Sequence, residues 1–378
     1  MNDLGTPMRV VVKLGTNVLT AGTTRLHRPR MVDFVRQLAA LRSAGHEVIL
    51  VTSGAVAAGL ECLQMQRRPR DVAQKQMLAA VGQSFIMHLY QQMFELYSVP
   101  VGQTLLTKAD ISDRHRYLNA RNTLLTCFAH GVVPIINEND AVVVDEIKVG
   151  DNDNLSALVA NLVDAQLLLI LTDIDGLYTA DPRSNPEATL IETVPHITPA
   201  IYALAGGTGS VRGTGGMMTK IQAADLATQS GIDVVIAPGA SPDVITRVVG
   251  GAHVGTRFPA QVNHREGRKR WILAETVRDC KIITDAGAAQ AIVSGGKSLL
   301  PAGITAVEGD FERGQTVRIF SPEREIARGL SLYHAADVRR IMGKKSTAIA
   351  DILGYDYGSA VVHRDDMIVV APDEARSA

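Results

Sequence analysis

Val10-Val11-Val12-Lys13-Leu14-Gly15-Thr16-Asn17 joins a β-branched apolar run to a lysine and a glycine. A run that is apolar throughout, rather than alternating with polar residues, is typical of a strand covered on both faces. The glycine allows backbone N–H groups to approach an anion closely, and the lysine adds a mobile positive charge. We therefore predict that this strand ends at an anion-binding site.

Similar apolar runs recur along the chain and alternate with helical patterns. The runs are Val48–Val51, Val132–Ile136, Leu167–Leu171 and Val234–Ile236, and the predicted helices begin near Pro29 and then cover Asp71–Tyr97, Tyr117–His130, Asn154–Val163 and Met217–Ser230. This alternation predicts right-handed βαβ units and an α/β fold, with an open, mostly parallel sheet sandwiched by helices. Ligands of such sheets bind at the carboxyl ends of the strands. The residues that follow the predicted strands should therefore gather at one edge, and these are Lys13, Ser53, Asn137, Thr172 and Pro238.

The pattern changes after Gly250, where a second and smaller domain is predicted. A basic stretch at 265–271 is typical of a solvated connector. Beyond it, short strand-like pieces alternate with glycine-rich turns, namely Lys281–Thr284, Thr316–Phe320, Glu325–Gly329, Ala360–His363 and Met367–Val370. We predict an α/β domain at 8–257, a linker at 258–275 and a small β-rich domain at 276–378.

Composition excludes several classes of protein. The chain has 378 residues, of which 46% are hydrophobic, and this is ample for two domains. Lys and Arg total 38 and Asp and Glu total 39, which argues against binding nucleic acid mainly by bulk charge. Cys62, Cys127 and Cys280 form no Cys-x-x-Cys pair, so structural zinc and a disulfide framework are disfavoured. With no signal pattern and no apolar run of membrane-spanning length, we expect a cytoplasmic protein with no membrane partner.

A second segment that combines lysine with glycine lies in the second half of the chain. It is Gly213-Thr214-Gly215-Gly216-Met217-Met218-Thr219-Lys220. Two such segments suggest a polyphosphate held from both sides, which suits phosphoryl transfer because positioning and charge neutralisation supply most of its catalysis. Neither segment has the glycine–lysine spacing of a P-loop, so that fold family is not supported.

Acidic and amide residues are dense after the third predicted strand, in Asn137-Glu138-Asn139-Asp140 and Gly150-Asp151-Asn152-Asp153-Asn154. Asp140 and Asn152 suit an ammonium or amide group. Asp153 precedes a helix, whose macrodipole stabilises a carboxylate there, and such a carboxylate could also orient the two lysines. A turn followed by a helix cap would use the same residue types, so this alternative stays open.

Two shorter motifs follow other predicted strands. Ser53, in Thr52-Ser53-Gly54-Ala55-Val56, could cap the next helix or could hold an anionic end of a substrate. No Gly-x-Ser-x-Gly elbow surrounds it, so a nucleophilic serine is not expected. Thr172 and Asp173 open the segment 172–178 and could bind ribose, base or a magnesium-bound phosphate, or could form only an Asp-Gly turn.

Together these segments resemble the glutamate 5-kinases of the amino acid kinase superfamily. They occur in the family's order from residue 8 to about residue 255. The lysine-bearing loops are shared across the superfamily, whereas the Asn-Asp cluster together with the tail is specific to the glutamate 5-kinases. The tail resembles a PUA domain, through Ser298-Leu299-Leu300-Pro301-Ala302-Gly303 and Leu353-Gly354-Tyr355-Asp356-Tyr357-Gly358.

The resemblance implies an activity. ATP would phosphorylate the γ-carboxylate of L-glutamate to L-glutamyl 5-phosphate, in the first step of proline biosynthesis. Magnesium would bind through the nucleotide phosphates, with no metal site in the protein itself. The family also implies a homo-oligomer, a tetramer or a dimer, that is inhibited by proline.

The resemblance also implies a role for each site residue. Lys13 and Lys220 would neutralise the phosphates, and Asp153 would hold both lysines. Ser53, Asp140 and Asn152 would bind glutamate. The nucleotide would be bound by Lys13, Thr172, Asp173, Thr214, Gly215, Gly216, Met217, Met218, Thr219 and Lys220.

Three other functions remain open at this stage. An acetylglutamate kinase would bind an acylated nitrogen, whereas the acidic residues around Asp140 favour a free amino acid. A nucleotide-monophosphate kinase needs extra basic residues, for which Arg114, Arg116 and Arg121 are available. The PUA-like tail could bind RNA, but its charges from Thr276 to Ala378 show no basic excess, so we do not expect a nucleic acid partner.

Overall fold

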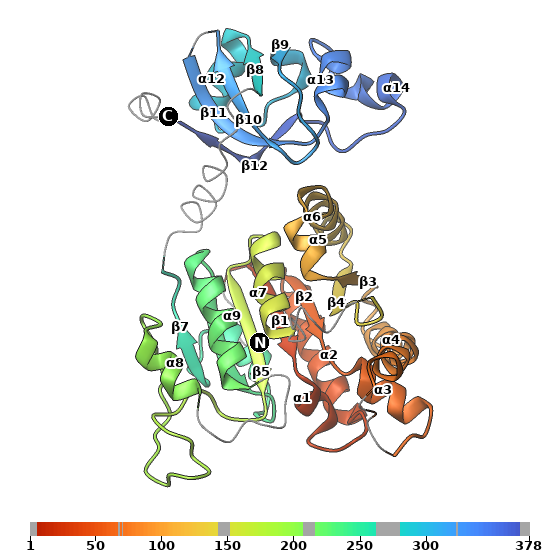
Figure 1. The fold of residues 1–378 in the computed structure, drawn as a ribbon, viewed down its shortest axis with the longest axis vertical. Coiled ribbons are helices and arrows are strands. Elements are labelled where there is room, and N and C mark those ends of the chain that lie inside the picture. The colour runs from red at the N-terminus through yellow and green to blue at the C-terminus, as the bar shows by residue number, and fades with distance from the viewer. Residues whose placement is uncertain are drawn as a thin grey trace. The chain divides into compact units, whose positions relative to one another are not determined.

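The computed structural model describes residues 6–66, 69, 71–142, 152–206, 216–261, 280–322 and 324–370. The chain divides into two compact units (Figure 1). One unit takes Met1–Ser112 and Asn119–His264, and the other takes Asp113–Leu118 and Arg265–Ala378. Most of the predicted linker, 258–275, lies outside the described residues, and so does the basic stretch 265–271. The predicted domain boundaries therefore stay a prediction.

A seven-stranded sheet is the framework of the first unit. Its order is β3-β4-β2-β1-β5-β6-β7, and every strand is parallel to its neighbours except β7, which is antiparallel to β6. Near the end of β1, Lys13 is in register with Val51 of β2 and Ile170 of β5, so three carboxyl ends lie together at one edge. The strands are β1 Arg9–Leu14, β2 Glu47–Thr52, β3 Val101–Leu106, β4 Val133–Glu138, β5 Leu167–Thr172, β6 Asp233–Pro238 and β7 Thr256–Phe258.

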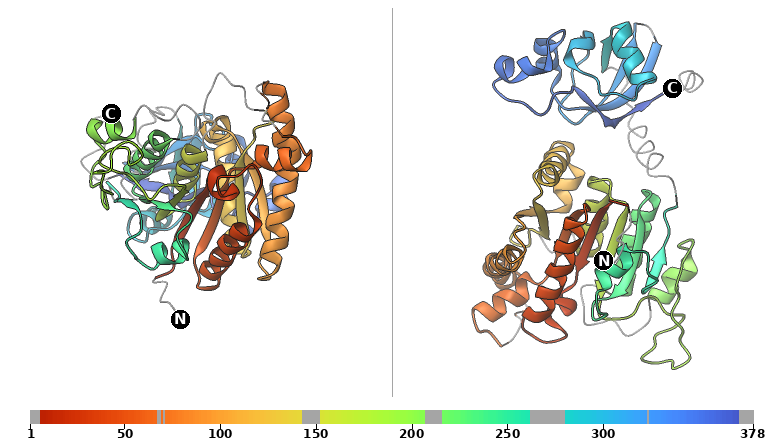
Figure 2. Two further views of the ribbon diagram at one scale, coloured as in Figure 1. Left: turned by 90° about the horizontal axis from the view of Figure 1, so that it is seen from below. Right: turned by 180° about the vertical axis from the view of Figure 1, so that it is seen from behind.

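Helices cover both faces of this sheet (Figure 2). On one face, Val10, Val12 and Leu14 pack into an apolar core with residues of α2 and α4. Successive residues of a strand point to opposite faces. Lys13 therefore points to the other face, where α7 packs against β1 and β5 and pairs with α9. The helices are α1 Thr16–Thr20, α2 Arg28–Ser43, α3 Ala55–Cys62, α4 Val72–Glu95, α5 Lys108–Ser112, α6 Arg114–Ala129, α7 Asn152–Leu162, α8 Pro199–Ala205, α9 Met217–Gln229 and α10 Val244–Val249.

The predicted fold class, an α/β domain with a mostly parallel sheet, is confirmed. Every strand and helix predicted in this unit is present to within a few residues. Local signals explain this agreement: Pro29 lies in the first turn of α2, and Asp71 caps α4 by accepting a hydrogen bond from the Gln74 backbone N–H at 2.8 Å. The sequence does not predict β3, because this edge strand is partly exposed and its Gly102 and Gln103 interrupt the apolar pattern.

Helices α3 and α4 approach each other closely at two glycines. A Cβ atom on Gly82 would lie 1.8 Å from the Ala55 carbonyl oxygen, and one on Gly59 would lie 2.1 Å from the Leu78 carbonyl oxygen. The obstacles are backbone atoms, which cannot rotate away as a flexible side chain could. Glycine is therefore required at both positions by the spacing of the helices.

We expect Gly82→Ala to lower the free energy of unfolding by about 3 kcal/mol, since the added methyl group forces the two helices apart. Calorimetric unfolding of the full chain measures this. Gly287→Ala is the matched control, because a Cβ there meets only a side-chain oxygen of Asp285, at 3.4 Å. A Gly82→Ala protein as stable as the control would contradict the close packing.

The second unit contains a five-stranded sheet in the order β12-β11-β10-β8-β9. The prediction of two separate strands at Ala360–His363 and Met367–Val370 is wrong, because they are parts of one strand, β12, whose pairing with β11 shifts register at an irregularity between Gly329 and Ser331. The strands are β8 Lys281–Thr284, β9 Ile304–Glu308, β10 Thr316–Ser321, β11 Arg324–Ser331 and β12 Val362–Val369, and the α-helices are α12 Ala286–Val293, α13 Ala335–Ile341 and α14 Ile349–Leu353.

Candidate functional site

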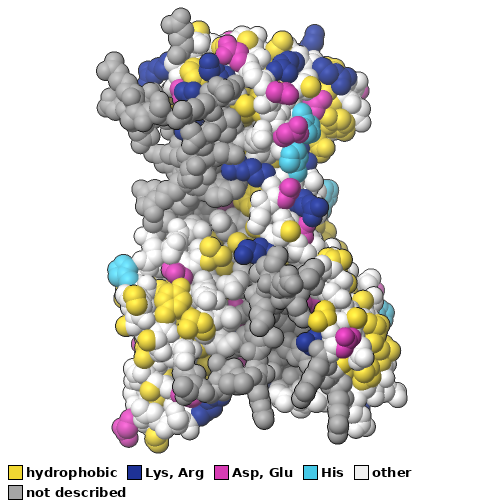
Figure 3. Space-filling model, in the orientation of Figure 1, with side chains coloured by type: hydrophobic (Ala, Val, Ile, Leu, Met, Phe, Trp, Pro, Cys, Tyr) yellow, Lys and Arg dark blue, Asp and Glu magenta, His cyan; other side chains and the backbone are white. Residues whose placement is uncertain are grey.

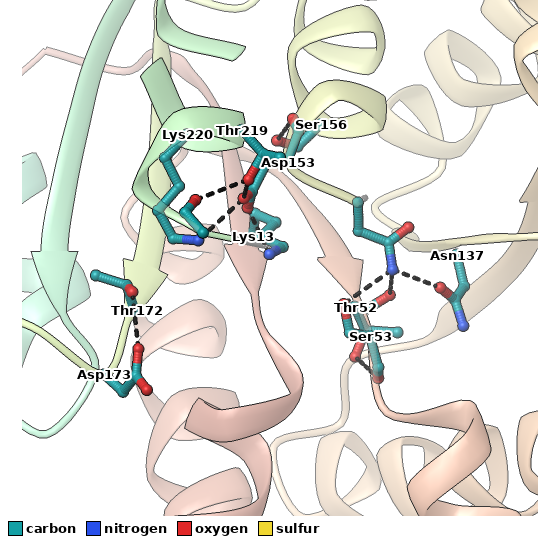
Figure 4. Close-up of polar contacts among 12 residues, drawn as sticks. Lys13, Thr52, Ser53, Asn137, Asp153, Ser156, Thr172, Asp173, Thr219 and Lys220 are labelled. Carbon is teal, nitrogen blue, oxygen red and sulfur yellow. Dashed lines mark hydrogen bonds and ion pairs between the residues drawn. The ribbon is translucent and has the colours of Figure 1, made fainter. Parts of the chain in front are cut away.

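Lys13, Asp153 and Lys220 form a buried charge cluster at the carboxyl edge of the first sheet (Figure 4). The Nζ atom of Lys13 lies 2.5 Å from Oδ1 of Asp153, and Nζ of Lys220 lies 3.0 Å from Oδ2. The three residues are only 4%, 0% and 7% exposed, in chain order. β1, the first turn of α7 and the first turn of α9 each supply one of them. The structure thus brings together two lysines that are remote in the chain.

The carboxylate between the lysines stays ionised for an electrostatic reason. Burial by itself would raise the pKa of Asp153, but the charges of Lys13 and Lys220 outweigh it and hold that pKa well below its ordinary value. One negative and two positive charges leave the cluster with a net positive charge. The site is therefore prepared to attract an anion.

The start of α9 completes this cluster. The hydroxyl of Thr219 lies 2.9 Å from Oδ2 of Asp153 and 2.8 Å from the Gly216 carbonyl oxygen, and can donate to either. Gly216 is the N-cap of α9, and Met217 and Met218 are half-buried in its first turn. Thr214 and Gly215 lie outside the described residues. The amino-terminal end of α9 favours anions because its first N–H groups have no partners within the helix.

Gly15 leaves room beside Lys13. Its φ of −78° and ψ of 160° are open to any residue, so its backbone conformation does not require glycine. A Cβ atom there would lie 3.5 Å from Nζ of Lys13. A side chain would therefore occupy space next to the ammonium group, where an approaching phosphate would have to sit.

Thr172 and Asp173 lie on one side of the cluster, at the end of β5. The Asp173 carboxylate accepts hydrogen bonds from Asn17 Nδ2 at 2.9 Å and from the Thr172 hydroxyl at 3.2 Å. Burial raises the pKa of Asp173, but the bond from Asn17, a backbone hydrogen bond, the bond from Thr172 and the charge of Lys220 together outweigh it and lower the pKa below its ordinary value. The bond from Asn17, which the sequence analysis did not place in the site, ties the first turn of α1 to the loop after β5.

Ser53 and Asn152 lie on the other side of the cluster, at the end of β2. The capping alternative for Ser53 is wrong, because Gly54 is the N-cap of α3 and no side chain caps it. Instead the Ser53 hydroxyl accepts a hydrogen bond from Asn152 Nδ2 at 2.9 Å. The same Nδ2 also lies 3.0 Å from the Thr52 carbonyl oxygen and 3.0 Å from Asn137 Oδ1.

These contacts decide which atom of the Asn152 amide remains available. The Thr52 carbonyl can only accept, so the NH2 group of Asn152 must face it. The Oδ1 atom of Asn152 is buried and has no hydrogen-bond partner among the residues that the structure describes. A buried acceptor without a partner is costly, and a ligand N–H would relieve that cost.

Asp140 is half-buried in the turn after β4, on the same side as Asn152. Asp151 and the preceding residues 143–150 lie outside the described part of the chain. Gln83 of α4, which the sequence analysis did not single out, accepts a hydrogen bond from Asn137 Nδ2 at 2.7 Å. Its position within an amphipathic helix carries no signal that it contacts the edge of the sheet.

The order of the strands sets the order of these groups. Along the edge β4-β2-β1-β5, the amide and hydroxyl group comes first, the two cations follow, and Thr172 and Asp173 come last (Figure 4). The cations therefore stand between two separate polar sites. This is the arrangement expected for transfer of an anionic group from one bound molecule to another.

Comparison with known proteins agrees with the family resemblance seen in the sequence. The model of the amino acid kinase family matches residues 8–238. The chain belongs to the amino acid kinase family. The PUA domain model matches residues 280–353, within the second unit, so the predicted PUA-like fold is confirmed as well.

Relatives of this family member align over almost its whole length. A glutamate 5-kinase of Herpetosiphon aurantiacus is 64% identical over 362 residues, which are 96% of this chain and 98% of the relative. A glutamate 5-kinase of Deinococcus radiodurans is 60% identical over 96% of this chain and 100% of its own length. One of Escherichia fergusonii is 55% identical over 95% of this chain and 98% of the relative.

One residue considered for a monophosphate substrate is engaged elsewhere. Arg121 is buried, and its guanidinium lies 2.5 Å from Asp164 and donates to the Leu162 carbonyl. These partners lie at the end of α7 and in the turn before β5, at the amino-terminal edge of the sheet. Within the described ranges there is no cluster of three or more His, Cys, Asp or Glu that could hold a metal, and no helix long and apolar enough to span a membrane.

Proposed function

We propose that this amino acid kinase transfers the γ-phosphoryl group of ATP to the γ-carboxylate of L-glutamate, giving L-glutamyl 5-phosphate and ADP in the first step of proline biosynthesis. The observation that carries this is the pair of lysines held by Asp153 between two polar sites. The substrate assignment is supported by the glutamate 5-kinases that align over nearly the full chain.

The reaction needs no general base to activate the carboxylate. A carboxylate with an ordinary pKa of about 4.3 is already ionised at neutral pH, so no base has to remove a proton. A carboxylate oxygen forms the new bond to phosphorus while the bond from phosphorus to the ADP oxygen breaks. The barrier lies in bringing two anions together, and Lys13 and Lys220 lower it by neutralising charge in the transition state.

Each side of the cluster takes one substrate. The nucleotide lies over β5 and α9, held by Lys13, Thr172, Asp173 and the residues from Thr214 to Lys220. Glutamate lies over β2 and β4, held by Ser53, Asp140 and Asn152. Its α-ammonium group suits the Asn152 Oδ1 acceptor, which an acylated nitrogen with a single N–H and no charge would fill less well.

The nucleotide would bring magnesium to the site. Both oxygens of Asp153 are ion-paired with lysines, so this carboxylate is committed to positioning the two cations. A magnesium ion would therefore be held by the ATP phosphates, where it supplies further charge neutralisation.

We also propose a cytoplasmic homo-oligomer inhibited by proline. Figure 3 shows hydrophobic side chains gathered over α3 and α4, and the exposed residues there include Leu63, Met65, Val72 and Met77. An exposed apolar group of this kind suits contact with a second copy of the chain. Sedimentation of the purified protein, and ADP release with and without added proline, test the two proposals.

Release of ADP across free amino acids, N-acetylglutamate and nucleoside monophosphates tests the activity. Of these candidate acceptors, we expect only L-glutamate to support the release of ADP from ATP. We also expect hydroxylamine to trap the acyl phosphate as a hydroxamate. Release with N-acetylglutamate or a monophosphate, and none with glutamate, would replace this proposal by one of the two alternatives.

A further inference from the structure

We infer that Gln83 of α4 is a positioning residue for the amino acid substrate, acting through Asn137 on Asn152. This inference rests on the proposed function. Gln83 is only 8% exposed and comes from a helix that supplies none of the site residues described above. Gly82 beside it allows α4 to approach the first turn of α3, and Gln83 reaches Asn137 at the end of β4.

The first step joins Gln83 to Asn137. Oε1 of Gln83 accepts a hydrogen bond from Asn137 Nδ2 at 2.7 Å. An amide can present its oxygen on one side only when its NH2 group lies on the other. With the NH2 group of Asn137 held by Gln83, its Oδ1 atom is directed to the backbone N–H of Glu138 at 2.9 Å and to Asn152.

The second step joins Asn137 to Asn152. Asn137 Oδ1 accepts from Asn152 Nδ2 at 3.0 Å, and the Thr52 carbonyl and the Ser53 hydroxyl lie near the same Nδ2. All three partners accept hydrogen bonds from the NH2 group of Asn152. The chain of amides thereby keeps Asn152 Oδ1 as the free acceptor for the ammonium group, and Gln83 is the far end of that chain.

The Nε2 atom of the Gln83 amide indicates that packing alone does not explain why a glutamine occupies this position. Its Nε2 atom is buried and has no hydrogen-bond partner in the part of the chain that the structure describes. An apolar side chain of the same length would avoid that unpaired donor. What an apolar side chain could not replace is the bond to Asn137.

Steady-state kinetics of Gln83→Met test the inference. We expect the KM for glutamate to rise about tenfold, the equivalent of one hydrogen bond, while the KM for ATP stays constant. The melting temperature should change little, because the variant exchanges the unpaired Nε2 of Gln83 for an unpaired Nδ2 of Asn137. Gln83→Glu, which keeps an acceptor for Asn137, should show a smaller rise in the KM for glutamate.

Tyr90→Phe is the matched control from the same helix. It removes a buried hydroxyl that lies 2.8 Å from the Thr52 hydroxyl, outside the amide chain, and should leave the KM for glutamate unchanged. If Gln83→Met does not fold, Gln83→Asn, whose amide is too short to reach Asn137, replaces it with the same expectation.

Two results would overturn the inference. One is an unchanged KM for glutamate in the Gln83 variant, and the other is a parallel rise of both KM values with a lower melting temperature, which would indicate a merely structural role. A wild-type enzyme that releases no ADP with glutamate would instead overturn the proposed function, and with it the substrate of this inference.

Discussion

Asp153→Asn is expected to cost about 3–5 kcal/mol of folding free energy, because it leaves two buried ammonium groups without their shared counter-ion. The same change frees both lysines to move apart, and displacement of catalytic groups by about 1 Å can cost on the order of 10²-fold in kcat. Chemical unfolding and ADP release measure the two effects. An Asp153→Asn protein with wild-type stability would show that the ion pairs contribute little.

A second substitution distinguishes the effect of unbalanced buried charge on stability from the loss of a catalytic cation. In Asp153→Asn combined with Lys220→Met, only one buried charge is left, so the double variant should be more stable than Asp153→Asn alone. It should not regain activity, because one of the two cations is missing. Equal stability of the single and double variants would contradict charge imbalance as the cause.

The contribution of Asp153 to stability should depend on pH in a defined direction. The pKa of Asp153 is lowered in the folded protein, so its stabilising effect is fully present above the unfolded-state value of about 3.9. It is lost as the pH falls from there toward the lower folded-state pKa. The stability difference between wild type and Asp153→Asn should therefore be constant near neutral pH and should shrink only below about pH 4.

Lys220→Met is expected to remove about 3 kcal/mol of transition-state stabilisation, or on the order of 10²-fold in kcat. Met keeps most of the side-chain volume, and Lys13 remains to balance Asp153, so the protein should stay folded. Because the charge that Lys220 neutralises develops in the transition state, the KM for glutamate should change little. Circular dichroism and ADP release at saturating substrate check these expectations.

The control for this prediction is Lys344→Met, which removes an exposed lysine of the second unit and should leave kcat unchanged. A kcat of Lys220→Met close to that of the control would remove Lys220 from the catalytic mechanism. Comparable losses in Lys220→Met and Lys13→Met would support the symmetric arrangement around Asp153.

Much of the first unit follows from local patterns. The runs that became β1, β2, β4, β5 and β6 are continuous and apolar because helices cover both faces of the sheet, and this pattern is visible without coordinates. Parallel strands bring their carboxyl ends to one edge, so residues following them could be predicted to meet. Edge strand β3 lacked the pattern because it is buried less completely.

Other features depend on contacts that leave no local signal. Gln83 is one polar residue in a long helix, and only the packing of α4 on α3 brings it to Asn137. The orientation of the Asn152 amide depends on the Thr52 carbonyl, a backbone group that is the same for every residue type. Ser53 suits a helix cap by its residue type, and its role as an acceptor for Asn152 is decided by distance alone.

The residues along the chain were enough to establish the fold class, the two lysine segments and the acidic cluster, since periodicity and residue type are local properties. They could not establish that Asp153 offers one oxygen to each lysine, or which atom of Asn152 is left for a ligand. Those properties depend on ångström-scale distances between elements far apart in the chain, and such distances exist only once β1, α7 and α9 have packed together.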